Sequence, residues 1–224
     1  TEDALTNSKS LFNDNTTVIS FQNGIGNEEI VQNILKNEIL GGVTQQGASI
    51  VQPGVIKAYA DMPSYIGDLN GGNSESAEKI ANLFSKNGLK TFCSNNIKLE
   101  IWKKLFANVG YSAISALCDM KIGEFFEVKE LEITILQLVE EARMVARAEG
   151  YIISESESKE AMYNINGPKG TTGNRSMMGW DILNKRKTEI NVINGAVVKL
   201  GEKHDIPTPV NQTIMSLIKG LEKN

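Results

Sequence analysis

The stretch LKTFCSNNIKLEIWKKLFANVGYSA, residues 89–113, contains the change of structure that decides the fold. It begins with Leu89 to Phe92, a short apolar run with the character of a strand. From Ile97 onward, apolar residues recur at helical spacing and almost no strand signal follows. We therefore expect an α/β part in residues 1–95 and an all-helical part in residues 96–224.

Upstream of this stretch, short β-branched or apolar runs alternate with turns and helical segments. Strands are expected at residues 16–21, 39–44, 48–51, 55–59 and 65–67, and helices at 1–11, 27–35 and 75–87. Asn27 is a good N-cap, because it is followed by Glu28 and Glu29 in the first turn. Gly88 suits the end of the third helix, where a positive φ is common.

Downstream, the apolar spacing is helical throughout. Helices are expected at residues 97–117, 128–150, 155–165, 175–199 and 209–222. The sequence contains no internal repeat and no low-complexity segment.

Composition excludes several classes of function. With 41% hydrophobic and 22% charged residues and a net charge of −4, the chain is an ordinary globular protein and a poor partner for nucleic acid or an acidic membrane. Cys93 and Cys118 lie too far apart for a CxxC pair, and His204 is the single histidine, so no metal site is expected. No apolar run is long enough to cross a bilayer and no signal peptide is visible, so a cytoplasmic protein is expected.

A polar stripe marks the first long helix of the second part. Lys104, Asn108 and Ser112 recur every four residues and lie on one helical face among apolar neighbours. A lysine partly shielded from water has a lowered pKa and is a better proton donor near neutral pH. A stripe of this kind is also compatible with the solvated side of an amphipathic helix.

Two further stretches carry polar residues at turns. In RKTEINVING, residues 186–195, Thr188 is a candidate helix cap with Glu189 in the first turn. In QNGIG, residues 22–26, a GxG pair follows a strand, where ligands of open α/β sheets gather. Each stretch alone is also explained by local structure.

Taken together, these stretches resemble the ketopantoate reductase (2-dehydropantoate 2-reductase) family, in order and in spacing. The motifs that carry the resemblance are QNGIGN (22–27), LGGVTQQGA (40–48), WKKLFAN (102–108), RKTEINVINGAVVKLGE (186–202) and IPTPVN (206–211). The resemblance implies a Rossmann-type domain in residues 1–95, without its N-terminal part, and a helical domain like that of 6-phosphogluconate dehydrogenase in residues 96–224. It also implies NADPH as the cofactor, a homodimer, and reduction of ketopantoate to D-pantoate in pantothenate and coenzyme A biosynthesis.

The resemblance also assigns roles by position. Lys104 matches the general acid, and Glu189 matches the acidic residue that orients it beside the cofactor. Asn23 matches the asparagine that contacts nicotinamide and substrate, Asn108 a substrate-binding asparagine, and Gly47 a backbone contact to the cofactor. Hydride delivery to a ketone builds alkoxide charge, which a nearby ammonium stabilises and neutralises.

The sequence departs from the family pattern at several substrate positions. Ser112 stands for a second asparagine, Met177 follows Ser176 where a second serine is usual, and Ile122 replaces a polar contact. These changes favour a bulkier, more apolar 2-keto acid, so a D-2-hydroxyacid dehydrogenase for branched or aromatic substrates is an alternative. No GxGxxG fingerprint is present, so this chain alone is expected to be inactive, and a catalytically silent helical dimerisation module is a further alternative.

Overall fold

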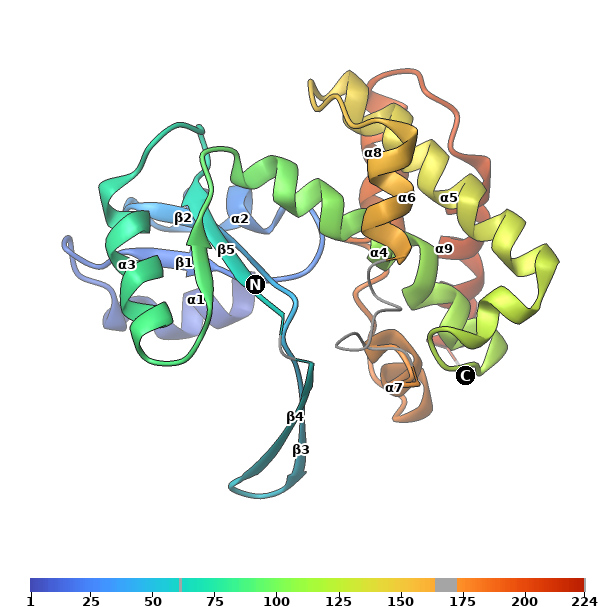
Figure 1. Cartoon of the computed structure of the whole chain (residues 1–224), viewed down its shortest axis with the longest axis horizontal. Coiled ribbons are helices and arrows are strands. Elements are labelled where there is room, and N and C mark those ends of the chain that lie inside the picture. The colour runs from blue at the N-terminus through green and yellow to red at the C-terminus, as the bar shows by residue number, and fades with distance from the viewer. Residues whose placement is uncertain (61, 164–172, 224) are drawn as a thin grey trace. The chain divides into compact units, whose positions relative to one another are not determined.

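The structure, a computed structural model, describes residues 1–60, 62–163 and 173–223 (Figure 1). The chain divides into two compact units, Thr1–Ile101 and Trp102–Asn224. All described strands lie in the first unit, and the described part of the second unit is helical. The expected fold class, a partial α/β sheet followed by a helical region, is confirmed. The domain boundary expected near residue 95 remains a prediction.

The sheet of the first unit consists of two strand–helix–strand modules. Its strands, in spatial order, are β1 (Val18–Ser20), β2 (Ile39–Thr44), β5 (Ser64–Asp68) and β6 (Thr91–Cys93). Strands β1 and β2 are parallel and connected by α2 (Asn27–Ile34), and β5 and β6 are parallel and connected by α3 (Glu75–Lys86). Parallel neighbours require such crossover connections. The two modules meet where β2 and β5 pair antiparallel.

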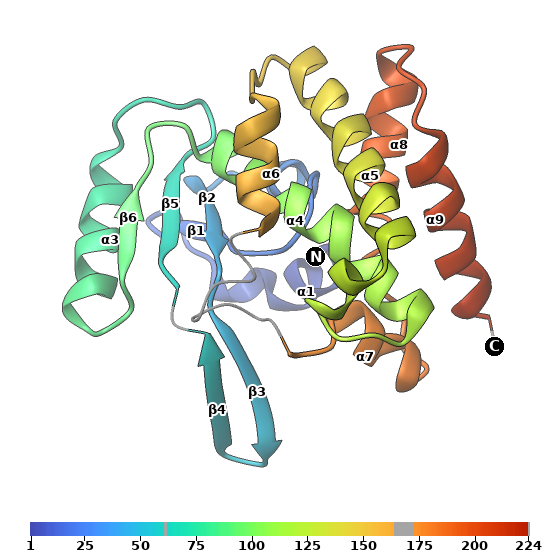
Figure 2. The ribbon, with the colours of Figure 1, turned by 45° about the vertical axis from the view of Figure 1, so that its right-hand side comes forward.

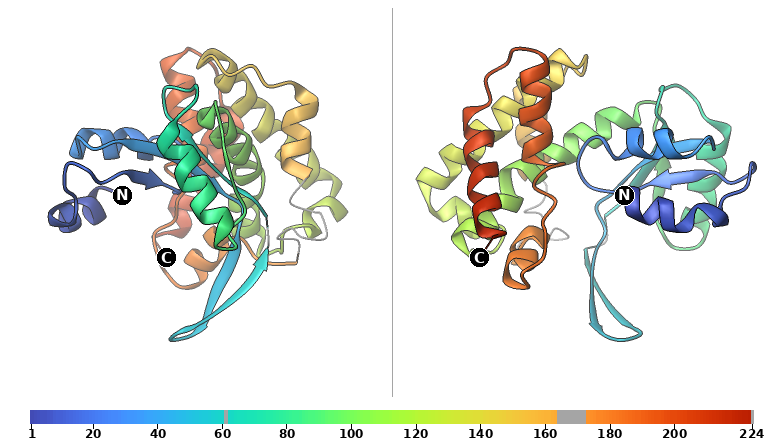
Figure 3. Two further views of the ribbon diagram at one scale, coloured as in Figure 1. Left: turned by 60° about the vertical axis from the view of Figure 1, so that its left-hand side comes forward. Right: turned by 180° about the vertical axis from the view of Figure 1, so that it is seen from behind.

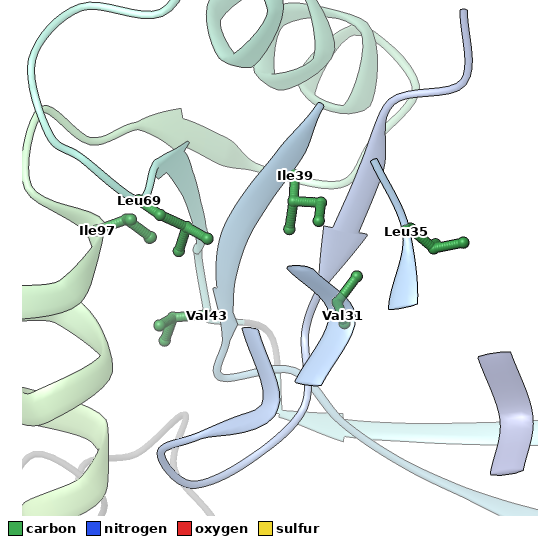
Figure 4. Close-up of a cluster of buried hydrophobic side chains, with 6 residues drawn as sticks. All are labelled: Val31, Leu35, Ile39, Val43, Leu69 and Ile97. Atoms are coloured by element: carbon green, nitrogen blue, oxygen red, sulfur yellow. The ribbon is translucent and has the colours of Figure 1, made fainter. Parts of the chain in front are cut away.

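Residues of β2 alternate between two layers of core. Ile39 and Val43 belong to a cluster on the α2 side of the sheet, which also includes the first residue of α4, Ile97 (Figure 4). Leu40 packs on the opposite side, with Ala77 of α3. Successive strand side chains point to opposite faces, so one buried strand supplies both layers.

A two-stranded hairpin lies between β2 and β5 in the sequence. Strands β3 (Gly47–Gln52) and β4 (Val55–Ala60) pair antiparallel and extend beyond the four-stranded sheet (Figure 2). Gly54 in the connecting turn has a φ of 80°, which favours glycine. Ile50 and Ile56 face each other across the hairpin and are 77% and 70% exposed.

The first unit begins with helical turns, as expected for residues 1–11. These are α1 (Glu2–Ser8) and the 3-10 helix η1 (Lys9–Leu11). Leu5 and Phe12 pack against the apolar cluster on the α2 side of the sheet.

The second unit is a set of packed helices. They are α4 (Ile97–Cys118, which begins in the first unit), η2 (Glu124–Glu127), α5 (Lys129–Ala148), α6 (Glu155–Tyr163), α7 (Met177–Leu183), α8 (Asn194–Lys203) and α9 (Pro209–Leu221). Helix α5 packs against α6, α8 and α9, and α8 and α9 lie side by side (Figure 3). The helix expected at 155–165 is confirmed up to Tyr163, and its last two residues lie outside the described part of the chain.

The helix predicted at 175–199 is wrong as a single element. The structure has α7 and α8 there, separated by ten residues of turns (184–193). Lys185 adopts a left-handed φ of 53°, and the Arg186 amide bonds back to the Asp181 carbonyl at 2.8 Å. These features end α7 in the manner of a helix C-terminus, although residues 184–189 contain no glycine or proline that would signal the end in the sequence.

Candidate active site

Helix α4 presents the polar stripe that the sequence predicts. Lys104, Asn108 and Ser112 are each half-buried, whereas the intervening Leu105 and Phe106 are at most 1% exposed. The four-residue spacing explains this arrangement, since it places the three polar side chains on one helical face. The stripe is therefore only partly solvated, which is the setting in which a lysine acquires an unusual pKa.

The electrostatics of Lys104 differ from those of an ordinary surface lysine. Burial lowers the pKa of its ammonium from 10.5 to about 8, and the negative charge of Glu189 opposes this by raising it. Desolvation disfavours the charged amine, and a nearby carboxylate favours it. Lys104 and Glu189 therefore interact electrostatically, and they are the two residues that the family resemblance pairs as general acid and orienting carboxylate.

Glu189 lies on the irregular turn between α7 and α8. Its carbonyl oxygen accepts hydrogen bonds from the amides of Val192 (3.1 Å) and Ile193 (3.2 Å). The turn is anchored just before Glu189, because the Thr188 amide and hydroxyl both donate to Glu222 Oε1, at 2.7 and 2.8 Å. Thr188 therefore holds a turn and does not cap a long helix, and Glu189 is carried by a fixed segment.

Ser176 caps α7 and joins it to the polar stripe. Its Oγ accepts from the Gly179 amide (3.0 Å) and donates to the Ser112 carbonyl (2.8 Å). Its amide donates to Ser115 Oγ at 3.0 Å. The sequence interpretation missed Ser115, although it extends the stripe by one helical turn after Ser112. Two residues expected to bind substrate, Ser112 and Ser176, are thus neighbours.

The first turn of α7 presents apolar side chains to solvent. Met177 is 57% exposed and Trp180 is 49% exposed. The guanidinium of Arg175 lies over the Trp180 ring, 5.9 Å from its centroid. Ile122 replaces a polar residue of some relatives. Its side chain is buried, and its amide donates a hydrogen bond to the Asn174 carbonyl at 2.9 Å.

The two cofactor residues expected in the first unit lie at strand boundaries. Asn23 is half-buried in the loop that leaves β1, and its carbonyl accepts from Asn27 Nδ2 at 2.9 Å. Gly47 is buried at the start of β3.

Sequence comparison then identifies the family. The model of "Ketopantoate reductase PanE/ApbA C terminal" matches residues 96–222, and that of "Ketopantoate reductase PanE/ApbA" matches residues 1–71. The chain belongs to the ketopantoate reductase family. It is therefore a member of a family of oxidoreductases, as its motifs predict.

Relatives named 2-dehydropantoate 2-reductase are 31–33% identical to this chain over the matched residues. The 2-dehydropantoate 2-reductase of Archaeoglobus fulgidus is 33% identical over 205 residues, which are 92% of this chain and 68% of that protein. The 2-dehydropantoate 2-reductase of Halobacterium salinarum is 31% identical over 92% of this chain and 67% of its own length. The chain thus spans about two thirds of these relatives.

Solved structures share the fold of this chain. D-mandelate dehydrogenase in ternary complex with NADH and anilino(oxo)acetate superimposes with a TM-score of 0.93 at 27% identity, over 99% of this chain and 72% of that one. A PanE/ApbA family ketopantoate reductase from Ralstonia eutropha gives 0.87 at 23% identity, over 99% and 72%, and so shows the same fold.

The loop after β1 carries groups whose chemistry can be compared with the two ends of a nicotinamide nucleotide. The amide side chain of Asn23 offers a donor and an acceptor, which suit a neutral carboxamide. Phosphates suit this loop poorly, because Glu28 and Glu29 occupy the first turn of α2. The GxG pair also lacks a third glycine, since Glu29 stands at that position. The chain therefore contains no GxGxxG cradle for the pyrophosphate.

The described residues include neither a membrane-spanning helix nor a metal-binding cluster. No described helix has the length and apolarity needed to span a membrane. Among the same residues, no group of three or more His, Cys, Asp or Glu side chains is arranged to hold a metal ion.

Proposed function

We propose that this chain carries the catalytic residues of an NADPH-dependent reductase that converts ketopantoate (2-dehydropantoate) to D-pantoate. The observation that carries the proposal is the partly buried Lys104, whose pKa lies near 8 and responds to Glu189. Membership of the ketopantoate reductase family, and relatives named 2-dehydropantoate 2-reductase at 31–33% identity, support this substrate.

The proposed mechanism assigns the proton to Lys104. When bound, a reduced nicotinamide supplies hydride to the carbonyl carbon of the substrate. Lys104 holds the proton that the carbonyl oxygen requires, and its ammonium stabilises the alkoxide charge that develops there. With a pKa near 8, the amine is mostly protonated at pH 7 and releases its proton more readily than an ordinary lysine. Glu189 favours the protonated form and orients it.

The remaining site residues are proposed to bind the two ligands. Asn108, Ser112, Ser176 and Met177 contact the keto acid in this proposal. Asn23 contacts nicotinamide and substrate, and Gly47 and Glu189 contact the cofactor. The proposal further assigns residues 1–95 to nucleotide binding and residues 96–224 to substrate binding and dimerisation as a homodimer.

A second candidate is a D-2-hydroxyacid dehydrogenase for branched or aromatic keto acids. Two observations favour it: the similarity to D-mandelate dehydrogenase, with a TM-score of 0.93, and the exposed apolar Met177 and Trp180. Exposed apolar side chains suit an aryl or branched substrate better than a hydroxylated one.

A substrate panel separates the two candidates. The complete gene product is assayed with NADPH and NADH against ketopantoate, 2-ketoisovalerate and phenylglyoxylate. The highest kcat/KM is expected for ketopantoate with NADPH. A higher value for phenylglyoxylate would favour the dehydrogenase. Absence of nucleotide oxidation with every acid would refute both, and would leave the silent dimerisation module.

A further inference from the structure

A buried polar network connects four helices of the second unit. Asn194 and Asn211 are fully buried and Glu141 is 7% exposed. They belong to α8, α9 and α5, and the network ends at a carbonyl of α4. Burying polar side chains to this degree costs free energy unless they form hydrogen bonds, so their partners need to be identified.

One end of the network is the N-terminus of α9. Glu141 Oε1 accepts from the Val210 amide and Oε2 from the Asn211 amide, both at 2.9 Å. A carboxylate in this position satisfies free helix amides and interacts favourably with the helix dipole. The first turn of α9 is therefore fixed on α5.

Asn211 connects Glu141 to Asn194 through hydrogen bonds of its side-chain amide. Its Nδ2 donates to Glu141 Oε2 (2.7 Å) and to the Leu138 carbonyl (3.1 Å), so its Oδ1 faces the other way. That Oδ1 accepts from Asn194 Nδ2 at 3.0 Å. Asn194 Nδ2 also donates to the Val109 carbonyl on α4, at 3.3 Å. Both amide orientations are thereby determined by their partners.

The arrangement leaves one polar atom without a partner. Asn194 Oδ1 is buried and makes no hydrogen bond to the described residues. Reversing the amide would place an oxygen against two acceptors, Asn211 Oδ1 and the Val109 carbonyl. The two donor bonds, to Asn211 Oδ1 and the Val109 carbonyl, therefore fix the orientation of the Asn194 side chain.

The position of Asn194 indicates what it constrains. It is the first residue of α8, directly after Ile193, whose amide bonds to the Glu189 carbonyl. Its acceptor Val109 follows Asn108 on α4, the helix that carries Lys104. One side chain thus bonds the helix of the acid to the end of the turn that carries the carboxylate.

We propose that Asn194 is a positioning residue that holds the Glu189 turn in register with Lys104 on α4. The inference rests on the acid and carboxylate roles proposed above. Thr188 and Glu222 secure the start of the turn, and Asn194 and Asn211 secure its end. With both ends fixed, Glu189 has little freedom to move away from Lys104.

The test measures how strongly Glu189 influences Lys104 and needs no turnover. The chain is labelled with acetic anhydride over a range of pH. Mass spectrometry of the peptide that contains both lysines then gives the rate of acetylation at Lys104, because fragment ions separate Lys103 from Lys104. The midpoint of rate against pH reports the pKa of the amine, independent of its accessibility. Glu189→Gln is compared in the unmodified background and in Asn194→Ala.

Two results are expected. In the unmodified background, Glu189→Gln lowers the midpoint, because it removes a charge that favours the ammonium; a fall of about one pKa unit would raise the free amine at pH 7 roughly fivefold. In Asn194→Ala, the same substitution leaves the midpoint almost unchanged. An equal fall in both backgrounds overturns the positioning role and leaves the acid–carboxylate pair standing. No fall in the unmodified background overturns the pair itself.

Matched variants guard against a general loss of structure. Asn184→Ala removes an exposed asparagine whose Nδ2 donates to the Trp180 carbonyl at 2.7 Å, and should leave the effect of Glu189→Gln intact. Asn194→Ser keeps one donor, which cannot serve both Val109 and Asn211. It replaces Asn194→Ala if circular dichroism shows that the alanine variant is unfolded.

Discussion

The hydroxyl of Ser176 donates a hydrogen bond to the carbonyl oxygen of Ser112 at 2.8 Å, and so ties the start of α7 to the polar stripe of α4. The two residues are separated by 64 positions in the chain. The same hydroxyl caps α7 by accepting from the Gly179 amide. One serine thereby determines where the exposed Met177 and Trp180 lie relative to the stripe.

Replacement of this serine should lower both stability and substrate affinity. Ser176→Ala removes the cap and its bond to α4, and should cost about 1–2 kcal/mol of unfolding free energy. If Ser176 also binds substrate, KM of the complete gene product rises as well. Urea unfolding and steady-state kinetics measure the two effects. Ser216→Ala, which removes an exposed hydroxyl bonded to Gln212, should change neither; similar losses in both variants would contradict the interpretation.

Lys104 should destabilise the fold at neutral pH. Its folded pKa, about 8, lies below the unfolded value of 10.5. Between these values the unfolded chain binds more protons, so stability rises with pH from about 8 to 10.5. Lys104→Met should therefore be more stable than the unmodified chain at pH 7, by on the order of 1–3 kcal/mol, with a smaller difference at pH 10. A difference that is constant with pH would show that the amine is not perturbed.

The fold was predictable where the signal is local. The buried run Ile39–Thr44 and the helical spacing after Ile97 both predict what is observed. The strand order was not predictable, because the antiparallel contact of β2 with β5 depends on pairing between distant segments. The predicted helix 175–199 failed because residues 184–189 contain no glycine or proline to signal the turns that involve Lys185 and the Thr188–Glu222 bonds.

In the candidate site, too, local features were predictable from the sequence and contacts between distant segments were not. The four-residue spacing of Lys104, Asn108 and Ser112 predicts a common face, and they share one. Lys104 and Glu189 are 85 positions apart in the chain, so their interaction could be predicted only from the family resemblance. The bond between Asn194 and Val109 has no signature in sequence, because it depends on how three helices pack.

Two helical glycines should respond in opposite directions to the same substitution. A Cβ on Gly110 of α4 would lie 3.0 Å from Ile135 Cγ2 on α5, so Gly110→Ala should destabilise the chain by about 1–3 kcal/mol. A Cβ on Gly220 of α9 would meet nothing within 4 Å, so Gly220→Ala should stabilise it by roughly 0.5–1 kcal/mol. Thermal unfolding decides; destabilisation by both would mean that α9 is packed differently.

The 224-residue chain should bind NADPH weakly. It contains no GxGxxG turn, and the helix N-terminus after its GxG pair carries Glu28 and Glu29. The pyrophosphate would therefore lack the backbone amides that normally hold it. Calorimetry should detect no binding at micromolar NADPH. Tight binding would show that other residues hold the phosphates.

The proton donor can be tested against its neighbour on the same helix. Lys103 and Lys104 point in directions about 100° apart. Glu157 lies on α6 and has a lowered pKa, mainly because Ser154 donates hydrogen bonds to its carboxylate. The positive charge of Lys103 also lowers this pKa, so Lys103 lies towards α6. Lys104 instead responds to Glu189. In the complete gene product, Lys104→Ala should lower kcat by about 10²–10⁴-fold with little change in NADPH affinity, because a positioned general acid contributes that much. Lys103→Ala should cost little. Equal losses of kcat in the two variants, or a larger loss for Lys103→Ala, would show that Lys104 is not the proton donor.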